Sequence, residues 1–253
     1  MSANHTWKLF LPGKKKPYLM AHRGNKARCP ENTLASFRQA LKDGADILET
    51  DVRLSADGVF MCIHDGTVDR TTDGMGEVAS MTLEQLKTLS AWDHRPGFEE
   101  ERIPTLAEVA ALLPPGCALA LELKTDRFFE DEVCRQFVRE LDAAGVRDRT
   151  VVISFHLGRV QHVQAHAPDI PTGWITMTGY RPKKNVQLLG PFWPLLLLNP
   201  LYVWIAHRQG QMVAPLDATP DGRIKYYRWL NCDAILSDDP AKTARKLKRS
   251  ILS

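Results

Sequence analysis

The stretch Ile47–Leu54, which reads Ile-Leu-Glu-Thr-Asp-Val-Arg-Leu, constrains the fold of this chain more than any other. Its apolar character predicts a β-strand, yet it carries Glu49 and Asp51 two positions apart. Side chains alternate along a strand, so the two carboxylates point to the same face. Taken alone, the stretch fits two interpretations equally well. It is either a half-exposed edge strand with an acidic face, or a strand that supplies two oxygen ligands to a hard divalent cation.

Strands and helices alternate on both sides of this stretch. A short apolar strand at 18–21 is followed by a helix, for which Asn32 is the expected N-cap and Gly44 the end. Such strand–helix–strand units build parallel sheets. Further strands are expected at 59–63, 117–124, 150–155, 172–177, 212–216 and 234–237. About eight strands in 253 residues predict an α/β fold of the (β/α)8 TIM-barrel type. The rival is a doubly wound sheet, but no Gly-x-Gly-x-x-Gly motif follows a strand.

Composition limits the classes of function. The net charge is only +3, so no nucleic-acid partner is expected. The five cysteines form no Cys-x-x-Cys pair, so the common zinc and redox motifs are absent and a reducing compartment is favoured. Residues 1–17 contain no long apolar run, so we expect no signal peptide and a cytoplasmic protein.

The longest apolar stretch covers residues 188–206. Pro191, Pro194 and Pro200 interrupt it, so we expect no transmembrane segment. A hydrophobic surface loop is expected instead. It either packs on the outside of the barrel or makes peripheral contact with lipid.

Ionisable side chains gather at the predicted strand ends. In a barrel of this kind, the active site lies at the C-terminal ends of the strands. Seven ionisable residues fall there: His22, Arg23, Glu49, Asp51, His64, Glu122 and Lys124. Each has an ordinary explanation by itself, such as a surface pair, a turn or an exposed edge. Together they indicate a site, because charged side chains are rare within apolar strands.

These residue types point to one chemistry. Glu49, Asp51 and Glu122 are oxygen-only ligands, which suit Mg²⁺ or Ca²⁺ better than zinc. The two histidines suit general acid and base roles near neutral pH. Arg23 and Lys124 suit an anionic oxygen group such as phosphate. The set therefore predicts metal-assisted phosphoryl chemistry.

A series of motifs along nearly the whole chain resembles the glycerophosphodiester phosphodiesterase family. In order, they are His22-Arg23-Gly24, Pro30-Glu31-Asn32-Thr33, Glu49-Thr50-Asp51, Asp57-Gly58, His64-Asp65-x-Thr67-x-Asp69-Arg70-Thr71-Thr72, Ile103-Pro104-Thr105-Leu106, Glu122-Leu123-Lys124 and Asp233-Ala234-Ile235-Leu236-Ser237-Asp238-x-Pro240. The resemblance implies a single TIM-barrel domain over residues 1–253. It also implies a small insertion after the third strand, at about 65–104.

The resemblance further implies hydrolysis of a glycerophosphodiester to sn-glycerol 3-phosphate and an alcohol. By that similarity the three carboxylates hold the metal, His22 and His64 act as acid and base, and Arg23 and Lys124 hold the phosphate. Two alternatives remain. The protein is a lysophospholipase D whose segment 188–204 contacts an acyl chain, or a phosphodiester-binding barrel without catalysis. A non-catalytic barrel would not need two acid–base histidines.

The chain departs from the family pattern in one place. Near the end of the chain, family members usually carry Trp-Thr-x-Asn on a strand. The corresponding residues here, 212–217, read Met-Val-Ala-Pro-Leu-Asp and contain no tryptophan. We therefore expect one wall of the substrate pocket to differ from that of the family.

Overall fold

The computed structural model describes residues 11–249, so most of the stretch expected to lack a signal peptide lies outside the described residues. Within this range the strands are β1 (Tyr18–His22), β2 (Ile47–Leu54), β3 (Phe60–Cys62), β4 (Ala118–Leu123), β5 (Thr150–Ser154), β6 (Thr172–Thr176), β7 (Leu188–Pro191), β8 (Met212–Val213) and β9 (Ala234–Ser237). The α-helices are α1 (Leu34–Lys42), α2 (Leu83–Thr88), α3 (Leu106–Ala111), α4 (Asp131–Ala143), α5 (Leu157–His166), α6 (Trp193–Leu198), α7 (Tyr202–Arg208), α8 (Ile224–Trp229) and α9 (Pro240–Lys246).

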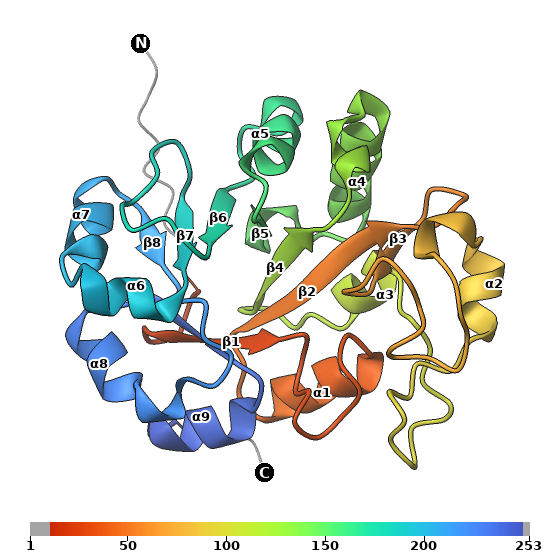
Figure 1. The fold of residues 1–253 in the computed structure, drawn as a ribbon, viewed down its shortest axis with the longest axis horizontal. Coiled ribbons are helices and arrows are strands. Elements are labelled where there is room, and N and C mark those ends of the chain that lie inside the picture. Colours follow the sequence, from red (N-terminus) through yellow and green to blue (C-terminus); the bar gives the residue numbers. More distant parts are fainter. Residues whose placement is uncertain (1–10, 250–253) are drawn as a thin grey trace.

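All of these strands except β3 run parallel and form a nearly closed barrel, with helices around it (Figure 1). Their order around the barrel is β8-β7-β6-β5-β4-β2-β1-β9. Between the two end strands, the backbone N–H of Asp233, just before β9, donates to the carbonyl of Val213 in β8 at 2.8 Å. The predicted (β/α)8 fold is confirmed.

Two strand predictions were wrong in an instructive way. The segment expected at 59–63 does form a strand, β3, but it pairs antiparallel with β2 and lies outside the barrel, while β2 pairs directly with β4. The missing barrel strand is β7, in the apolar stretch expected to be a surface loop; it lies between β6 and β8. Pro191 concealed this strand in the sequence, but it is the last residue of β7, and its carbonyl still accepts from the backbone N–H of Leu216 at 2.8 Å.

Apolar side chains fill the inside of the barrel and the layer between strands and helices. The interior cluster includes Met20, Ile47, Ala120 and Ile153, and the larger outer cluster packs the first helices against the strands. Residues 65–104 contribute to a separate small cluster with β3, which contains Met61, Val78 and Leu86. In Figure 1 this segment, with α2, projects to one side of the barrel.

The start of α1 differs from the prediction. Thr33, rather than Asn32, is the N-cap, and its side chain accepts from the backbone N–H of Ser36. Asn32 instead has a positive φ of 55° and turns its amide toward β2. This conformation, which asparagine tolerates better than most residues, makes Asn32 a partner of the candidate site.

No helix in the described part of the chain has the length and apolar character needed to cross a membrane.

Candidate active site

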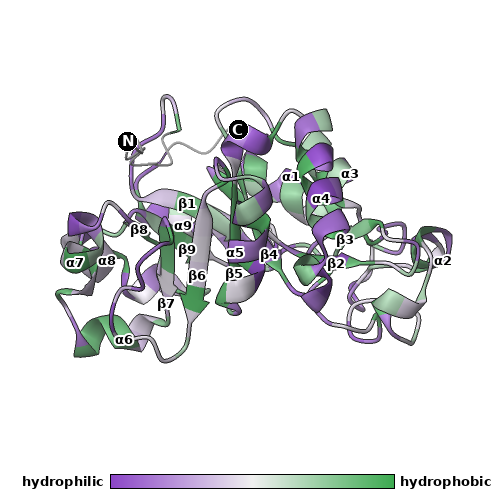
Figure 2. Ribbon diagram, turned by 90° about the horizontal axis from the view of Figure 1, so that it is seen from above, coloured by the Kyte–Doolittle hydropathy of each residue, from purple (hydrophilic) through white to green (hydrophobic). Residues whose placement is uncertain are grey.

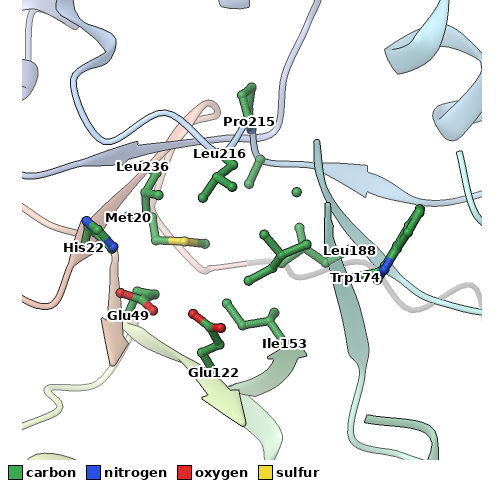
Figure 3. Close-up of a pocket in the computed structure, with 13 residues that line it drawn as sticks. Met20, His22, Glu49, Glu122, Ile153, Trp174, Leu188, Pro215, Leu216 and Leu236 are labelled. Atoms are coloured by element: carbon green, nitrogen blue, oxygen red, sulfur yellow. The ribbon is translucent and has the colours of Figure 1, made fainter. Parts of the chain in front are cut away.

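Glu49, Asp51 and Glu122 meet at the mouth of the barrel. Asp51 of β2 lies directly beside Glu122 of β4 in the parallel register. One carboxylate oxygen from each of the three residues lies within 4.8 Å of the others. All three side chains are buried, and Figure 3 shows Glu49 and Glu122 pointing into a common space. The edge-strand interpretation of β2 is therefore wrong, because β1 and β4 flank it on both sides.

Burial and neighbouring charges shift the pKa values of these three carboxyl groups. Burial, together with the charges of Asp51 and Glu122, raises the pKa of Glu49 well above its usual value. Burial also raises the pKa of Glu122. For Asp51, burial opposes ionisation, but Arg23 and Lys124 outweigh it and lower the pKa of this carboxyl group. Three adjacent carboxylates thus need more positive charge than these two side chains supply.

Arg23 and Lys124 face the carboxylates. Arg23 Nε lies 3.1 Å from Asp51 Oδ2, and its Nη1 donates to Glu31 Oε1 at 3.0 Å. Lys124 Nζ lies 2.8 Å from Glu122 Oε1 and 3.3 Å from Asp51 Oδ1. The two residues expected to bind phosphate therefore lie against the residues expected to bind metal. Phosphate bound beside the metal ligands would be within reach of both side chains.

The cluster fits a divalent cation in one further respect. Asp51 Oδ1 is buried and accepts no well-formed hydrogen bond, although Lys124 Nζ lies 3.3 Å away, whereas Oδ2 accepts from Asn32 Nδ2 at 2.9 Å. Glu49 Oε2 accepts from the backbone N–H of Arg23 at 3.0 Å. Metal-binding carboxylates are typically oriented in this way by hydrogen-bond donors on one of their oxygens. A hard cation would also supply the missing positive charge.

Each of the two histidines is paired with an aspartate. His22 Nδ1 lies 2.6 Å from Asp238 Oδ1, and His64 Nδ1 lies 2.6 Å from Asp65 Oδ1. In each pair Nδ1–H donates a hydrogen bond to the carboxylate, so the neutral ring carries its proton on Nδ1 and keeps an unprotonated Nε2. Burial lowers the pKa of both histidines, although the partner carboxylates oppose this effect. Both rings are therefore mainly neutral near pH 7, with Nε2 free to take up a proton.

Sequence reasoning did not assign roles to Asp65 and Asp238. Both follow the end of a strand, the position that singled out the other residues, and Asp238 belongs to a motif shared with the family. Arg70 was missed as well. It bridges Asp65 and Glu31, with distances of 2.6 Å from Nε and 2.7 Å from Nη2. No local pattern indicates this bridge, because it joins three separate loops.

The turn after β1 depends on a glycine. Arg23 and Gly24 both have positive φ values, 57° and 82°. A Cβ atom at Gly24 would lie 2.3 Å from Ser36 Oγ, so no other residue fits without displacing α1. The turn directs the Arg23 N–H at Glu49 and the Arg23 side chain at Asp51. Backbone conformation thus couples β1 to the carboxylates.

An apolar pocket adjoins the carboxylates. Beside His22, Glu49 and Glu122, it is lined by Met20, Ile153, Trp174, Ile175, Leu188, Gly190, Ala214, Pro215, Leu216 and Leu236 (Figure 3). Where the family usually carries Trp-Thr-x-Asn, the lining residues are Ala214, Pro215 and Leu216. An indole is present all the same, because β6 supplies Trp174. At positions 214–216 this wall of the pocket therefore presents alanine, proline and leucine side chains.

Comparison with known proteins finds relatives along nearly the whole chain. Residues 22–242 match the model of the Glycerophosphoryl diester phosphodiesterase family. Glycerophosphodiester phosphodiesterase of Caldanaerobacter subterraneus subsp. tengcongensis is 32% identical over 243 residues, which cover 89% of this chain and 95% of the relative. Human glycerophosphodiester phosphodiesterase 1 is 48% identical over 95 residues, 36% of this chain and 29% of the relative.

Solved structures show the same likeness. An Oleispira antarctica phosphodiesterase in complex with the product sn-glycerol-3-phosphate has a TM-score of 0.81 at 28% identity, covering 92% of this chain and 97% of the other. Glycerophosphodiester phosphodiesterase from Agrobacterium tumefaciens str. C58 has a TM-score of 0.80 at 26% identity, covering 90% of this chain and 99% of the other.

Proposed function

The chain belongs to the glycerophosphoryl diester phosphodiesterase family and is an enzyme that hydrolyses glycerophosphodiesters, and from this premise we propose the roles of its residues and its products. The products are sn-glycerol 3-phosphate, which the Oleispira antarctica relative binds, and an alcohol. One observation carries the assignment of the site. Three buried carboxylates, whose oxygens lie within 4.8 Å of one another, adjoin a histidine that Asp238 orients.

Glu49, Asp51 and Glu122 hold the divalent cation in this proposal. When bound, Mg²⁺ or Ca²⁺ supplies Lewis-acid chemistry to a phosphate oxygen. Arg23 and Lys124 stabilise the negative charge that develops on the phosphate. They are available for this role because a bound cation would neutralise part of the carboxylate charge that they otherwise balance. The buried setting strengthens each of these interactions, since less water screens them.

His22 and His64 move the protons. One Nε2 accepts a proton from the attacking water, or from the glycerol hydroxyl if a cyclic phosphate forms first. The other ring, in its protonated form, donates to the leaving alcohol. Asp238 and Asp65 hold the rings in position and stabilise the protonated form of each.

The direct test is release of glycerol 3-phosphate from several purified diesters, with and without a chelator. We expect activity that thorough chelation abolishes and that Mg²⁺ or Ca²⁺ restores. Comparing the two cations at equal concentration identifies the better cofactor. Undiminished activity after chelation contradicts the proposed role of the carboxylates.

A lysophospholipid is a second candidate substrate, because apolar surface lies next to the mouth. Helix α6 begins directly after β7, and Leu198 and Leu201 are 79% and 61% exposed. Trp204 on α7 is also exposed. Figure 2 shows α6 as a largely hydrophobic helix at the edge of the molecule. The apolar pocket near the carboxylates offers room for the first part of an acyl chain.

The charge around α6 and α7 also favours peripheral contact with lipid. No Asp or Glu occurs between Asp169 and Asp217, whereas Arg181, Lys183, Lys184 and Arg208 do. Exposed leucines and a tryptophan next to basic side chains are typical of surfaces that bind anionic membranes. We expect Leu198→Ser with Trp204→Ser to lower turnover of lysophosphatidylcholine in mixed vesicles. Turnover of glycerophosphocholine should stay unchanged; an equal loss on both substrates would contradict lipid contact.

Five cysteines without a disulfide in the described part of the chain support a reducing, cytoplasmic location.

A further inference from the structure

A second cluster of metal-ligating side chains lies outside the barrel, where α4 packs beside α5 (Figure 1). His162 and His166 stand four residues apart on α5, so they share one face of that helix. Cys134 of α4 faces them, and one ligand atom from each of the three residues lies within 4.8 Å of the others. Asp131, the first residue of α4, lies beside the two histidines. Its Oδ1 lies 3.1 Å from His162 Nε2 and 3.3 Å from His166 Nε2.

The protonation of His166 leaves hydrogen-bond acceptors facing one another, an arrangement that a bound cation would stabilise. His166 Nδ1 lies 3.0 Å from the carbonyl oxygen of His162, which can only accept, so Nδ1 carries the proton. In the neutral ring, Nε2 is then an acceptor, and it faces an oxygen of Asp131 that is an acceptor too. His162 Nε2 points at the same oxygen. Within residues 11–249, no Lys or Arg pairs with Asp131 to compensate this arrangement.

We propose that Cys134, His162 and His166 bind a Zn²⁺ ion that joins α5 to the beginning of α4. One thiolate and two imidazoles are typical zinc ligands, and a water molecule or a rotated Asp131 side chain supplies the fourth ligand of a tetrahedral site. The thiolate disfavours Mg²⁺ and Ca²⁺, which prefer oxygen. The bond from His166 Nδ1 to a backbone carbonyl is the contact that usually orients a zinc-bound histidine.

The cluster is buried at one end and open to solvent at the other. The Cys134 side chain is fully buried at the base, where its thiol donates to the carbonyl of Phe128 at 3.3 Å. The Asp131 side chain is 61% exposed at the opening. An ion can therefore enter from the Asp131 side, and Cys134 exchanges its thiol proton for the metal.

No local sequence motif reveals this site, because its ligands lie on two different helices. The absence of a Cys-x-x-Cys pair excludes the familiar zinc motifs only. The cluster is also separate from the catalytic carboxylates, whose ligands are all oxygens. The inference therefore does not depend on the proposed function.

Cobalt provides a spectroscopic test, since Co²⁺ occupies zinc sites and its bond to thiolate gives a charge-transfer absorption. Metal-free protein is titrated with Co²⁺, in the presence of saturating Mg²⁺. We expect this absorption to saturate at one equivalent and to disappear when Zn²⁺ is added. The catalytic carboxylates cannot produce it, because they contain no sulfur.

Variants locate the site. His162→Gln and Cys134→Ala should abolish the charge-transfer absorption, whereas His94→Gln and Cys117→Ala, at positions outside the cluster, should keep it. His162 is partly exposed, so His162→Gln remains informative if Cys134→Ala fails to fold. Unchanged hydrolysis of glycerophosphocholine by His162→Gln shows that the variant is folded. Absence of the absorption in the original protein, or its persistence in His162→Gln, would overturn the proposal.

Discussion

The two halves of the barrel mouth differ in chemistry. The half built on β9, β1, β2 and β4, together with the segment after β3, carries the carboxylates, Arg23, Lys124 and the two histidines paired with aspartates. The half built on β5 to β8 carries Ile153, Trp174, Leu188 and Leu216. Because only the first half can bind a cation or move protons, we assign catalysis to it and substrate selection to the second. Mutations in the two halves should therefore produce different kinetic effects.

The largest expected effect comes from Asp51→Asn, in the centre of the polar half. Removing this charge leaves Arg23 and Lys124 without their common partner and weakens cation binding. We expect kcat/KM to fall about 10³-fold, with a raised cation requirement. Steady-state rates over a series of Mg²⁺ and Ca²⁺ concentrations measure kcat/KM and the cation concentration that the variant requires. Asp148→Asn, at an exposed position, serves as the matched control; a small loss in Asp51→Asn would argue against a metal role.

His22→Ala and His64→Ala should lower kcat about 10²-fold, because each removes a proton-transfer group. Substrate binding should change far less, so KM remains close to its original value. Stopped-time assays at saturating diester measure kcat directly. Near-normal turnover in either variant would refute the acid–base assignment.

Asp65→Asn and Asp238→Asn should shift the pH dependence of kcat/KM and lower it about tenfold. Each carboxylate raises the pKa of its histidine, so its removal lowers that pKa further. If the histidine is the general base, the acidic limb of the profile moves to lower pH. If it is the general acid, the alkaline limb moves to lower pH.

The two variants therefore identify which histidine is the acid and which the base. Profiles that shift neither limb would mean that these carboxylates do not control the titration of the rings.

The smallest effect is expected in the apolar half. Leu216→Ala removes apolar contact from the pocket without touching the carboxylates. For a diester with an apolar alcohol group, we expect KM to rise about tenfold with kcat nearly unchanged. For glycerophosphocholine the change should be smaller. A large loss of kcat would contradict the assignment of catalysis and substrate selection to separate halves of the barrel mouth.

Much of the polar half was predictable from the sequence. The rule that barrel strands end at the active site placed Glu49, Asp51, Glu122 and His22 together, because each stands within or at the end of a strand with clear apolar character. The apolar half was less accessible. Prolines obscured β7, and β3 resembled a barrel strand although it forms a hairpin with β2. Strand pairing depends on contacts between distant segments, which a local pattern does not contain.

The sequence by itself determined the alternation of strands and helices, the residue types of the site and their order along the chain. The tertiary structure decided which atoms meet. It brought Asp238 to His22 and Asn32 to Asp51, and it placed Cys134 opposite two histidines of another helix. The physical reason is that local periodicity sets the face on which a side chain lies, whereas its neighbours depend on how the whole barrel closes.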